Sequence, residues 1–310
     1  MMRRLGLAVM TGALFTGTTW AQGPLVPLRW EAEKGKALAY DVSVEMTVRQ
    51  TEGEAEPRAM ELRQRARVSL TVEDMGEDGS AALTGTISGV SVGWKDGDVE
   101  ATWEEGGAEA GTDAGRVLAA IAQGAMQDAL RVTIDPQGMI SGMSGFDAAR
   151  AALEEQNALD ESALGMFEPV AMASRLAPMF QGDAGGAGEH VAGAGSRRVG
   201  HGWQTTERVG LGSAGALEIT TDWVLKEVTD GVALIEGVSR VEALRPQEPS
   251  PGAPVVRVEG ASGTTRTTWD MTAGALRSCE TEQALTMVWT LGDLTLRQEQ
   301  TSKSMVRRAE

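Results

Sequence analysis

Apolar and polar residues alternate along several long stretches of this chain. In the stretch 38–48 the even positions are apolar and the odd ones are polar or small, and the stretch 60–72 largely repeats this pattern. Further alternating stretches cover 265–271 and 279–291. Successive side chains of a β-strand point to opposite faces, so the pattern predicts antiparallel strands with one buried face. Strands of this length must twist and coil.

The last hairpin of the chain is predicted from its turn and its pattern together. Gly292-Asp293, with glycine first, suits a two-residue type II′ turn. That turn pairs Trp289 with Leu296 and Cys279 with Val306, so the apolar residues of both strands share one face. A slip of one residue would expose them to water, so pattern and turn agree on the register.

An earlier hairpin is predicted in the same way. Asp230-Gly231 is the sequence signal of a type I′ turn. With that turn, we expect Trp223 to lie opposite Val238 and Leu217 to lie opposite Leu244.

The first predicted hairpin joins the first two alternating stretches. If its centre is near Glu54, Glu45 lies opposite Arg63 and Asp41 lies opposite Arg67. Exposed cross-strand pairs of opposite charge contribute about 0.2–1 kcal/mol each and help to set the register.

A third strand follows and changes phase at Gly89, because the apolar positions before and after this glycine have opposite parity. A single glycine at a phase shift predicts a β-bulge. Asp96-Gly97 then predicts a turn into a short strand at 99–103.

The middle of the chain predicts short helices. Asp113 can cap a helix with apolar residues on one face. The stretch 146–181 is again helical in pattern, but two prolines interrupt it, and 182–202 is a loop rich in Gly and Ala. The predicted fold class is mainly β: long antiparallel strands in a strongly curved sheet or two packed sheets, with a few short helices from the middle of the chain covering one side.

Residues 1–21 have the features of a secretory signal peptide. Arg3 and Arg4 precede an apolar run from 5 to 15, and Ala21 stands at the expected cleavage point. The run is too short to span a bilayer. We therefore expect an exported protein, periplasmic or extracellular, without a transmembrane segment in the mature chain.

The remaining residues, 22–310, are predicted to form a single β-rich domain. Its two halves, 28–145 and 199–308, are joined by a helical and Gly-rich middle segment, 146–198. The formal charge of the whole chain is −16, and it becomes −18 when Arg3 and Arg4 are removed. Nucleic-acid binding needs clustered Lys and Arg, so no nucleic-acid partner is expected.

No residues are predicted to form a catalytic, cofactor or metal site. The stretch 210–215 matches the dinucleotide fingerprint G-x-G-x-x-G, but a strand pattern follows it where the phosphate cradle needs a helix. His190 and His201 lie in or beside the Gly-rich loop, which would not hold a zinc ion rigidly. Cys279 lies on the apolar side of its strand, which predicts a buried structural thiol. A group of turn acids lacks the spacing of a calcium loop and is predicted to be solvated: Asp74, Glu77, Asp78, Asp96 and Asp98.

Tryptophan is the most frequent aromatic residue, with eight Trp against four Phe and one Tyr. Four of them fall on apolar strand positions in the second half of the chain: Trp203, Trp223, Trp269 and Trp289. The main interpretation is that they form core under the helices. The alternative is that they line a hydrophobic cavity between sheet and helices, as in secreted carriers of acyl chains.

Three short motifs resemble a family of uncharacterised secreted bacterial β-rich proteins. They are Leu28-Arg29-Trp30 with Gly35 and Tyr40, Asp135-Pro136-Gln137-Gly138 with Ile140, and Val199-Gly200-His201-Gly202-Trp203. His201 and Gly202 stand where that family has an acidic-polar pair. The resemblance implies an exported β-rich fold and no particular activity. At the level of fold alone, long curved strands over helices are similar to periplasmic lipoprotein carriers such as the Lol system.

The sequence therefore favours an exported, non-enzymatic binding or structural protein of the cell envelope, with an unknown protein or a hydrophobic ligand as its partner. Two alternatives stay open: a carrier of lipid or another hydrophobic ligand, and an uncharacterised hydrolase. The carrier needs an internal apolar cavity, a binding module needs an exposed apolar patch or an unpaired sheet edge, and the hydrolase needs a cleft where acids and histidines converge.

Overall fold

The structure is a computed structural model. It describes residues 25–28, 30–31, 33–107, 111–136, 138–155, 176, 179–180, 196–246 and 252–309. The predicted signal peptide, His190 and most of the predicted middle segment lie outside these residues.

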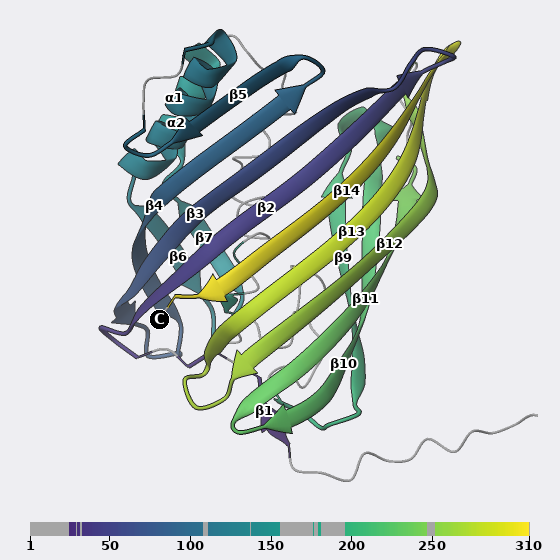
Figure 1. Ribbon diagram of the computed structural model, residues 1–310. Helices are drawn as coiled ribbons and strands as arrows, with labels where there is room; N and C mark the ends of the chain where they lie inside the picture. The colour runs from purple at the N-terminus through teal and green to yellow at the C-terminus, as the bar shows by residue number, and fades with distance from the viewer. Residues whose placement is uncertain are drawn as a thin grey trace, which may run out of the picture.

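The described chain is mainly β, as the sequence predicts. One antiparallel sheet has twelve strands and is not closed (Figure 1). Its strands are β2 (Ala37–Glu52), β3 (Arg58–Met75), β4 (Ala81–Asp96), β5 (Val99–Glu104), β6 (Leu130–Ile134), β7 (Ile140–Ser144), β9 (Gly202–Gly210), β10 (Ala216–Thr229), β11 (Val232–Leu244), β12 (Val255–Asp270), β13 (Ala275–Leu291) and β14 (Leu294–Arg308). Two short strands, β1 (Val26–Pro27) and β8 (Ser196–Arg197), pair with each other, and the described α-helices are α1 (Asp113–Gln127) and α2 (Asp147–Glu155).

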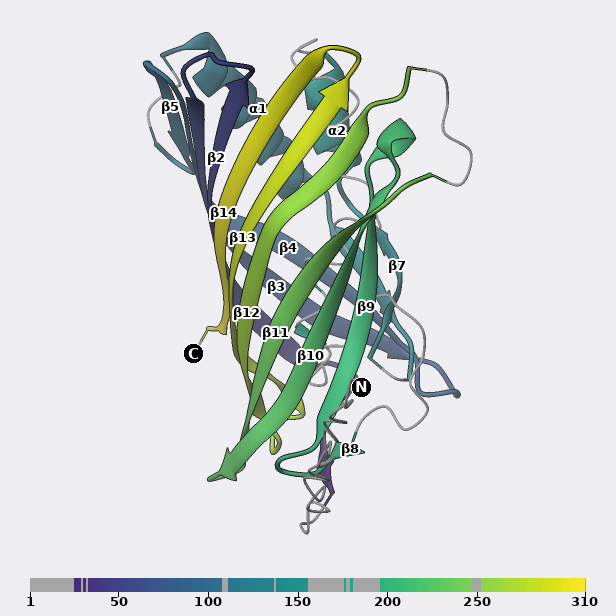
Figure 2. The same ribbon diagram turned by 90° about the vertical axis from the view of Figure 1, so that its right-hand side faces the viewer.

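The first and last long strands of the chain meet in the middle of the sheet. The strand order is β7-β6-β4-β3-β2-β14-β13-β12-β11-β10-β9, with β5 paired to β4. β14 therefore pairs with β2 and joins the early and late strands into one surface. Figure 1 looks at the outer side of β2, β13 and β14, while β9, β10 and β11 curl behind them. Figure 2, turned by 90°, shows β9–β11 in front of the interior, with β3 and β4 behind it.

The predicted registers of the first and last hairpins are confirmed. Trp289 pairs with Leu296 and Cys279 with Val306. Gly292 has φ +59° while Asp293 is not in the positive-φ region, as a type II′ turn requires. In the first hairpin, the expected ion-pair partners also lie opposite each other: Asp41 with Arg67, and Glu45 with Arg63.

The predicted bulge at Gly89 is also present. Arg65 pairs with Ser91 and Arg67 with Ser88, so two residues of β4 face one residue of β3. Gly89 has φ +59°, a conformation in which a side chain would be strained.

The predicted register of the β10–β11 hairpin is wrong by one residue. Its turn is as expected, with φ +51° at Asp230 and +76° at Gly231. However, a bulge at Lys226 shifts the ladder, so Trp223 lies opposite Gly237 instead of Val238. Leu217 correspondingly lies opposite Ala243 instead of Leu244.

The helix α1 begins one residue earlier than its predicted cap implies. Thr112, not Asp113, is the N-cap, and its hydroxyl accepts a hydrogen bond from the Gly115 N–H at 3.0 Å. α1 packs on β4 and β5 and against α2. Its apolar face meets Val90 and Trp103, so the helices cover one side of the sheet as predicted.

The main core lies at the lower end of the sheet in Figure 1. It joins residues of the early strands, such as Tyr40 and Leu70, to residues of the late strands, such as Ile235 and Trp269. Residues outside the large sheet complete it: Val26, Leu28, Trp30, Phe146, Leu176, Met179 and Phe180. The rings of Trp30 and Phe180 meet edge to face at 5.4 Å. The interior is therefore filled at this end of the curved sheet.

Candidate functional site

The central strands have two chemically different faces. We call the face that carries Val42, Cys279 and Trp289 the inner face, because it also carries the main core, and we call the opposite face the outer face. The ladder pairings assign every residue of β2, β13 and β14 to one face or the other, since side chains alternate along each strand.

The inner face of these three strands is uncharged over almost its whole length. Its residues are Tyr40, Val42, Val44, Met46, Val48 and Gln50 of β2, then Val306, Ser304, Ser302, Gln300, Gln298 and Leu296 of β14, then Cys279, Thr281, Gln283, Leu285, Met287 and Trp289 of β13. Charged residues return at the two ends, with Glu52 at one and Arg308 at the other. The inner face thus offers only apolar groups and neutral hydrogen-bonding groups.

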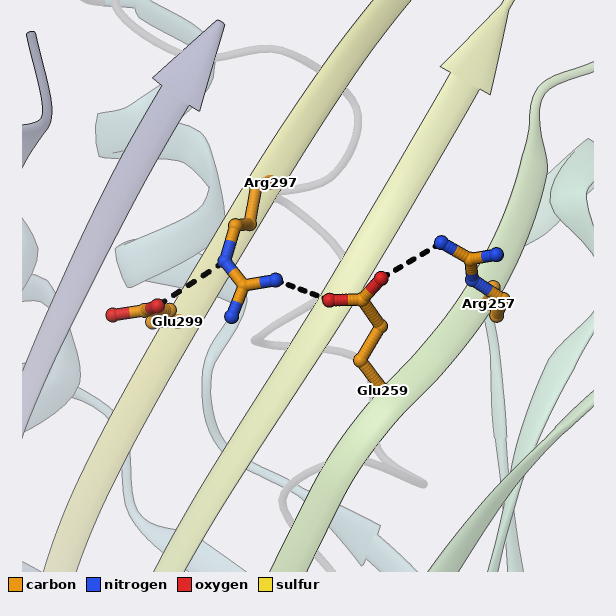
Figure 3. A network of polar contacts seen from close by, with 4 residues as sticks. All are labelled: Arg257, Glu259, Arg297 and Glu299. Carbon is orange, nitrogen blue, oxygen red and sulfur yellow. Dashed lines mark hydrogen bonds and ion pairs between the residues drawn. The ribbon is translucent and has the colours of Figure 1, made fainter. Parts of the chain in front are cut away.

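The outer face of the same strands is a network of ion pairs. Arg297 contacts Glu299 at 3.2 Å and also contacts Glu259, which in turn contacts Arg257 at 2.7 Å (Figure 3). Val288 is directly opposite both arginines in the ladder and is only 9% exposed, so the network covers it. Similar pairs continue across the face, with 2.8 Å between Arg67 and Asp41 and 2.6 Å between Lys303 and Glu280.

One row of paired residues crosses the inner face above the main core, and we call it the inner trough. From β4 to β10 it contains Trp94, Leu62, Met46, Ser302, Gln283, Gly263, Ser239 and Thr221. Trp94, Leu62 and Met46 are half-buried, so apolar surface is available in the first part of the row. The second part is neutral and polar, and the hydroxyls of Ser239 and Thr221 lie 2.8 Å apart.

A small hollow of about 50 Å³ opens at the polar end of the inner trough. Its apolar walls are Leu217, Ile219, Val241 and Leu285, and its polar walls are Ser239, Gln283, Gln300 and Ser302. A larger hollow of about 440 Å³ lies over the outer side of Ala284 and Thr301, where Glu45, Glu282 and Lys303 line it. The larger hollow carries charged side chains, whereas the inner hollow is lined only by apolar and uncharged polar side chains.

The four tryptophans singled out from the sequence lie on the inner face but in two separate clusters. Trp223 and Trp269 belong to the main core, and Trp203 packs against it. Trp203 and Trp223 are stacked with ring centroids 6.5 Å apart, and the Arg197 guanidinium lies 4.9 Å from the Trp203 ring. Trp289 belongs to a second cluster at the other end, which also contains Leu217, Val241 and Leu285 of the inner hollow. The four residues therefore fall into two clusters instead of one.

Several buried donors of the inner side have no hydrogen-bond partner. They are the indole N–H groups of Trp30, Trp269 and Trp289 and the hydroxyl of Tyr40. By contrast, the indole N–H of Trp223 donates to the Thr205 hydroxyl at 2.9 Å. Burial raises the pKa of the Tyr40 phenol, against the lowering influence of Arg308, so the phenol keeps its proton.

The remaining predicted residues are placed apart from one another. His201 is exposed before β9. The glycine-rich stretch 210–215 is a hairpin loop between β9 and β10, and no helix N-terminus follows it. Cys279 is buried as predicted, which raises the pKa of its thiol, although hydrogen bonds from Thr267 and Thr281 lower it. Among the described residues, no group of three or more His, Cys, Asp and Glu is arranged to hold a metal ion.

The prediction of solvated turn acids is wrong for Asp96. Asp96 is 8% exposed and accepts a hydrogen bond from the Arg58 Nε at 2.6 Å. Asp74 and Asp78 are exposed, as expected. The partner of Asp96, Arg58, is the first residue of β3, the strand paired with β4, and stands 38 residues earlier in the chain, so no local pattern indicates this pair.

No helix within the described ranges combines the length and the apolar character needed to cross a membrane.

Comparisons with known proteins place this chain in no family, because no family model and no curated protein matches its sequence. A solved structure on lipid-protein interactions in lipovitellin is similar, with a TM-score of 0.45 and 11% identity over 90% of this chain. This chain spans 26% of that lipovitellin chain. OccK7 (OpdD) of Pseudomonas aeruginosa gives a TM-score of 0.24 and 9% identity, over 89% of this chain and 99% of the other. TM-scores this low do not establish a shared fold, so the function is argued from the site alone.

Proposed function

We propose that this protein is an exported binding protein that holds a largely apolar ligand in its inner trough. The observation that carries the proposal is the separation of charge between the two faces of the central strands. Ion pairs cover the outer face, whereas the inner face of β2, β13 and β14 is neutral between its ends.

Two further features support this proposal. Half-buried Met46, Leu62 and Trp94 give the trough an apolar floor that is not completely covered. The inner hollow adds about 50 Å³ of space lined by both apolar and uncharged polar side chains. Ligand sites generally combine an apolar lining with a few polar groups that orient the ligand.

Export is part of the proposal and rests on the signal-like residues 1–21. Mass spectrometry of the protein from its native host tests it, since cleavage after Ala21 leaves a chain that begins at Gln22. A cytoplasmic protein that keeps residues 1–21 would contradict export.

Native mass spectrometry of the same preparation tests whether the protein binds an apolar ligand. A co-purifying apolar molecule at a fixed ratio is expected. A stoichiometric protein partner without such a molecule would instead favour an interaction module that uses the free edge of β9, where the sheet ends.

Substitutions on opposite faces of one strand test the site itself. Ser302 faces the inner trough and its neighbour Thr301 faces outward. Ser302→Glu places an unpaired carboxylate beside the ligand, and the bound apolar molecule should be lost or weakened at least about tenfold. Thr301→Glu adds the same charge to the solvated face and should retain the ligand. Equal retention by both variants would place the ligand elsewhere.

A further inference from the structure

Three uncharged polar residues lie next to one another on the inner face, and we call them the polar patch. Ser302 of β14 pairs with Gln283 of β13, and Gln300 is the neighbouring inner-face residue of β14. All three line the inner hollow and are exposed or half-buried, so a ligand there can reach their hydroxyl and amide groups. Within the described ranges, their side chains form no hydrogen bond. The polar patch therefore offers accessible donors and acceptors.

Apolar residues lie on both sides of the polar patch. Toward β2, Gln300 pairs with Val48, which in turn pairs with Met60 of β3. Toward β13, Gln300 pairs with Leu285, which in turn pairs with Ala261 of β12. The row through Gln300 thus changes from apolar to polar and back to apolar as it crosses the sheet.

Both apolar walls extend beyond this row and remain accessible. The wall on the early strands continues into Met46 and Leu62, which pair with each other and are half-buried. The wall on the late strands continues into Ile219 and Val241, which also pair with each other and are half-buried. These last two residues line the inner hollow as well. A ligand on the polar patch therefore has apolar surface on two sides of it.

A ligand with its polar group at one end does not match this arrangement. If the polar end lies on the polar patch, the hydrocarbon chain covers one wall and leaves the other wall in water. If the chain instead crosses the patch, methylene groups bury the amides and the hydroxyl without partners, which costs free energy. A polar group between two hydrocarbon arms avoids both losses.

We infer that the ligand is an uncharged lipid whose polar group lies between two hydrocarbon arms. This inference rests on the proposed function and specifies its ligand class. The polar group lies on the polar patch, and one arm lies on each apolar wall. The described lining of the inner hollow contains no charged side chain, so an ionised group would be buried there without a counter-charge.

Two isomeric esters test the position of the polar group. Nonyl nonanoate carries its ester in the middle, and methyl heptadecanoate carries its ester at one end. The purified protein is incubated with an excess of an equimolar mixture and separated from free lipid by gel filtration. The bound esters are then extracted and quantified by gas chromatography. Nonyl nonanoate should be enriched at least about threefold, because only this isomer matches both walls and the patch.

A double variant tests the polar patch itself. Gln283→Leu with Gln300→Leu removes both amides and should bring the ratio of the two bound esters close to one. Gln50→Leu with Gln298→Leu is the matched control, because these glutamines pair with each other on the same inner face but do not line the inner hollow. The control should keep the enrichment. Since both esters are measured in one sample, a partial loss of folded protein does not change their ratio.

The outcomes distinguish this inference from the function on which it rests. Equal retention of the two esters by the wild type, or enrichment of methyl heptadecanoate, would overturn the inference while the apolar-ligand function stands. The same holds if the polar-patch variant keeps the full enrichment or if the control loses as much of it. Retention of neither ester would overturn both the inference and the function.

Discussion

At the scale of single residues, the absence of a side chain at Gly237 of β11 leaves room for the ring of Trp223 on the neighbouring strand β10. The two residues are paired in the ladder, and a Cβ on Gly237 would come within 2.6 Å of the ring. Gly237→Ala should therefore lower the free energy of unfolding by about 1–3 kcal/mol through overpacking, as measured by urea denaturation.

Gly260 of β12 is the control for this substitution. Its Cβ would meet nothing within 4 Å, and its φ is not positive. Gly260→Ala should change the free energy of unfolding by less than about 0.5 kcal/mol. If both variants lose the same stability, the loss comes from strand glycines in general and not from the Trp223 contact.

Two buried groups that can lose a proton, the Cys279 thiol and the Tyr40 phenol, make the stability of the fold sensitive to alkaline pH. Burial raises the pKa of Cys279 and of Tyr40 in the folded protein. Their contribution is therefore fully present below the unfolded pKa values, about 8.5 for Cys and about 10 for Tyr, and is lost as the pH rises through the folded values.

The double variant Cys279→Ala, Tyr40→Phe should lose less stability between about pH 8 and pH 11 than the wild type does. Urea midpoints at a series of pH values measure this. Parallel curves for the two proteins would show that other groups control the alkaline loss.

At the scale of elements, the N-terminus of α1 depends on Thr112. Thr112→Ala removes the hydroxyl that accepts from Gly115 and should cost about 1 kcal/mol, seen as faster hydrogen exchange of the α1 amides. Asp113→Ala leaves this bond intact and should have the smaller effect. The reverse order would mean that Asp113 is the effective cap, as the sequence pattern alone indicates.

The two bulges show which parts of the registers can be read from a sequence. At Gly89 the apolar positions change parity beside a glycine, and the positive φ there explains why a glycine is present. At Lys226 the extra residue is exposed and lies between buried Leu225 and exposed Glu227, so no glycine marks the bulge. The ladder of β10 and β11 could therefore not be placed to the residue, although its turn was recognised.

At the scale of the whole molecule, the sheet should be most protected at its centre. β13 and β14 have partners on both sides, whereas β9 ends the path of the sheet. Hydrogen exchange should therefore be slowest in β13 and β14 and faster in β9. Slow exchange along β9 in the purified protein would show that its free edge is covered.

The candidate site could be predicted only in part from the sequence, because the pattern of a strand shows which residues share a face but not which distant strands pack over that face. Strand parity places Cys279 and Trp289 on one face, and the structure confirms this. Which distant strands meet above that face depends on the curvature of the sheet, and no short motif encodes it. Leu217 of β10 and Leu285 of β13 come together in one cluster and line the inner hollow in this way.

The unpaired edges of the sheet also affect the width of its interior. In a closed barrel, the number of strands and their stagger fix the radius. Here β7 and β9 end the strand order without pairing with each other, so no such relation sets the width of the interior. A change in twist can widen or narrow it while every ladder bond is kept, so under the proposed function one set of backbone pairings would accommodate ligands of different girth.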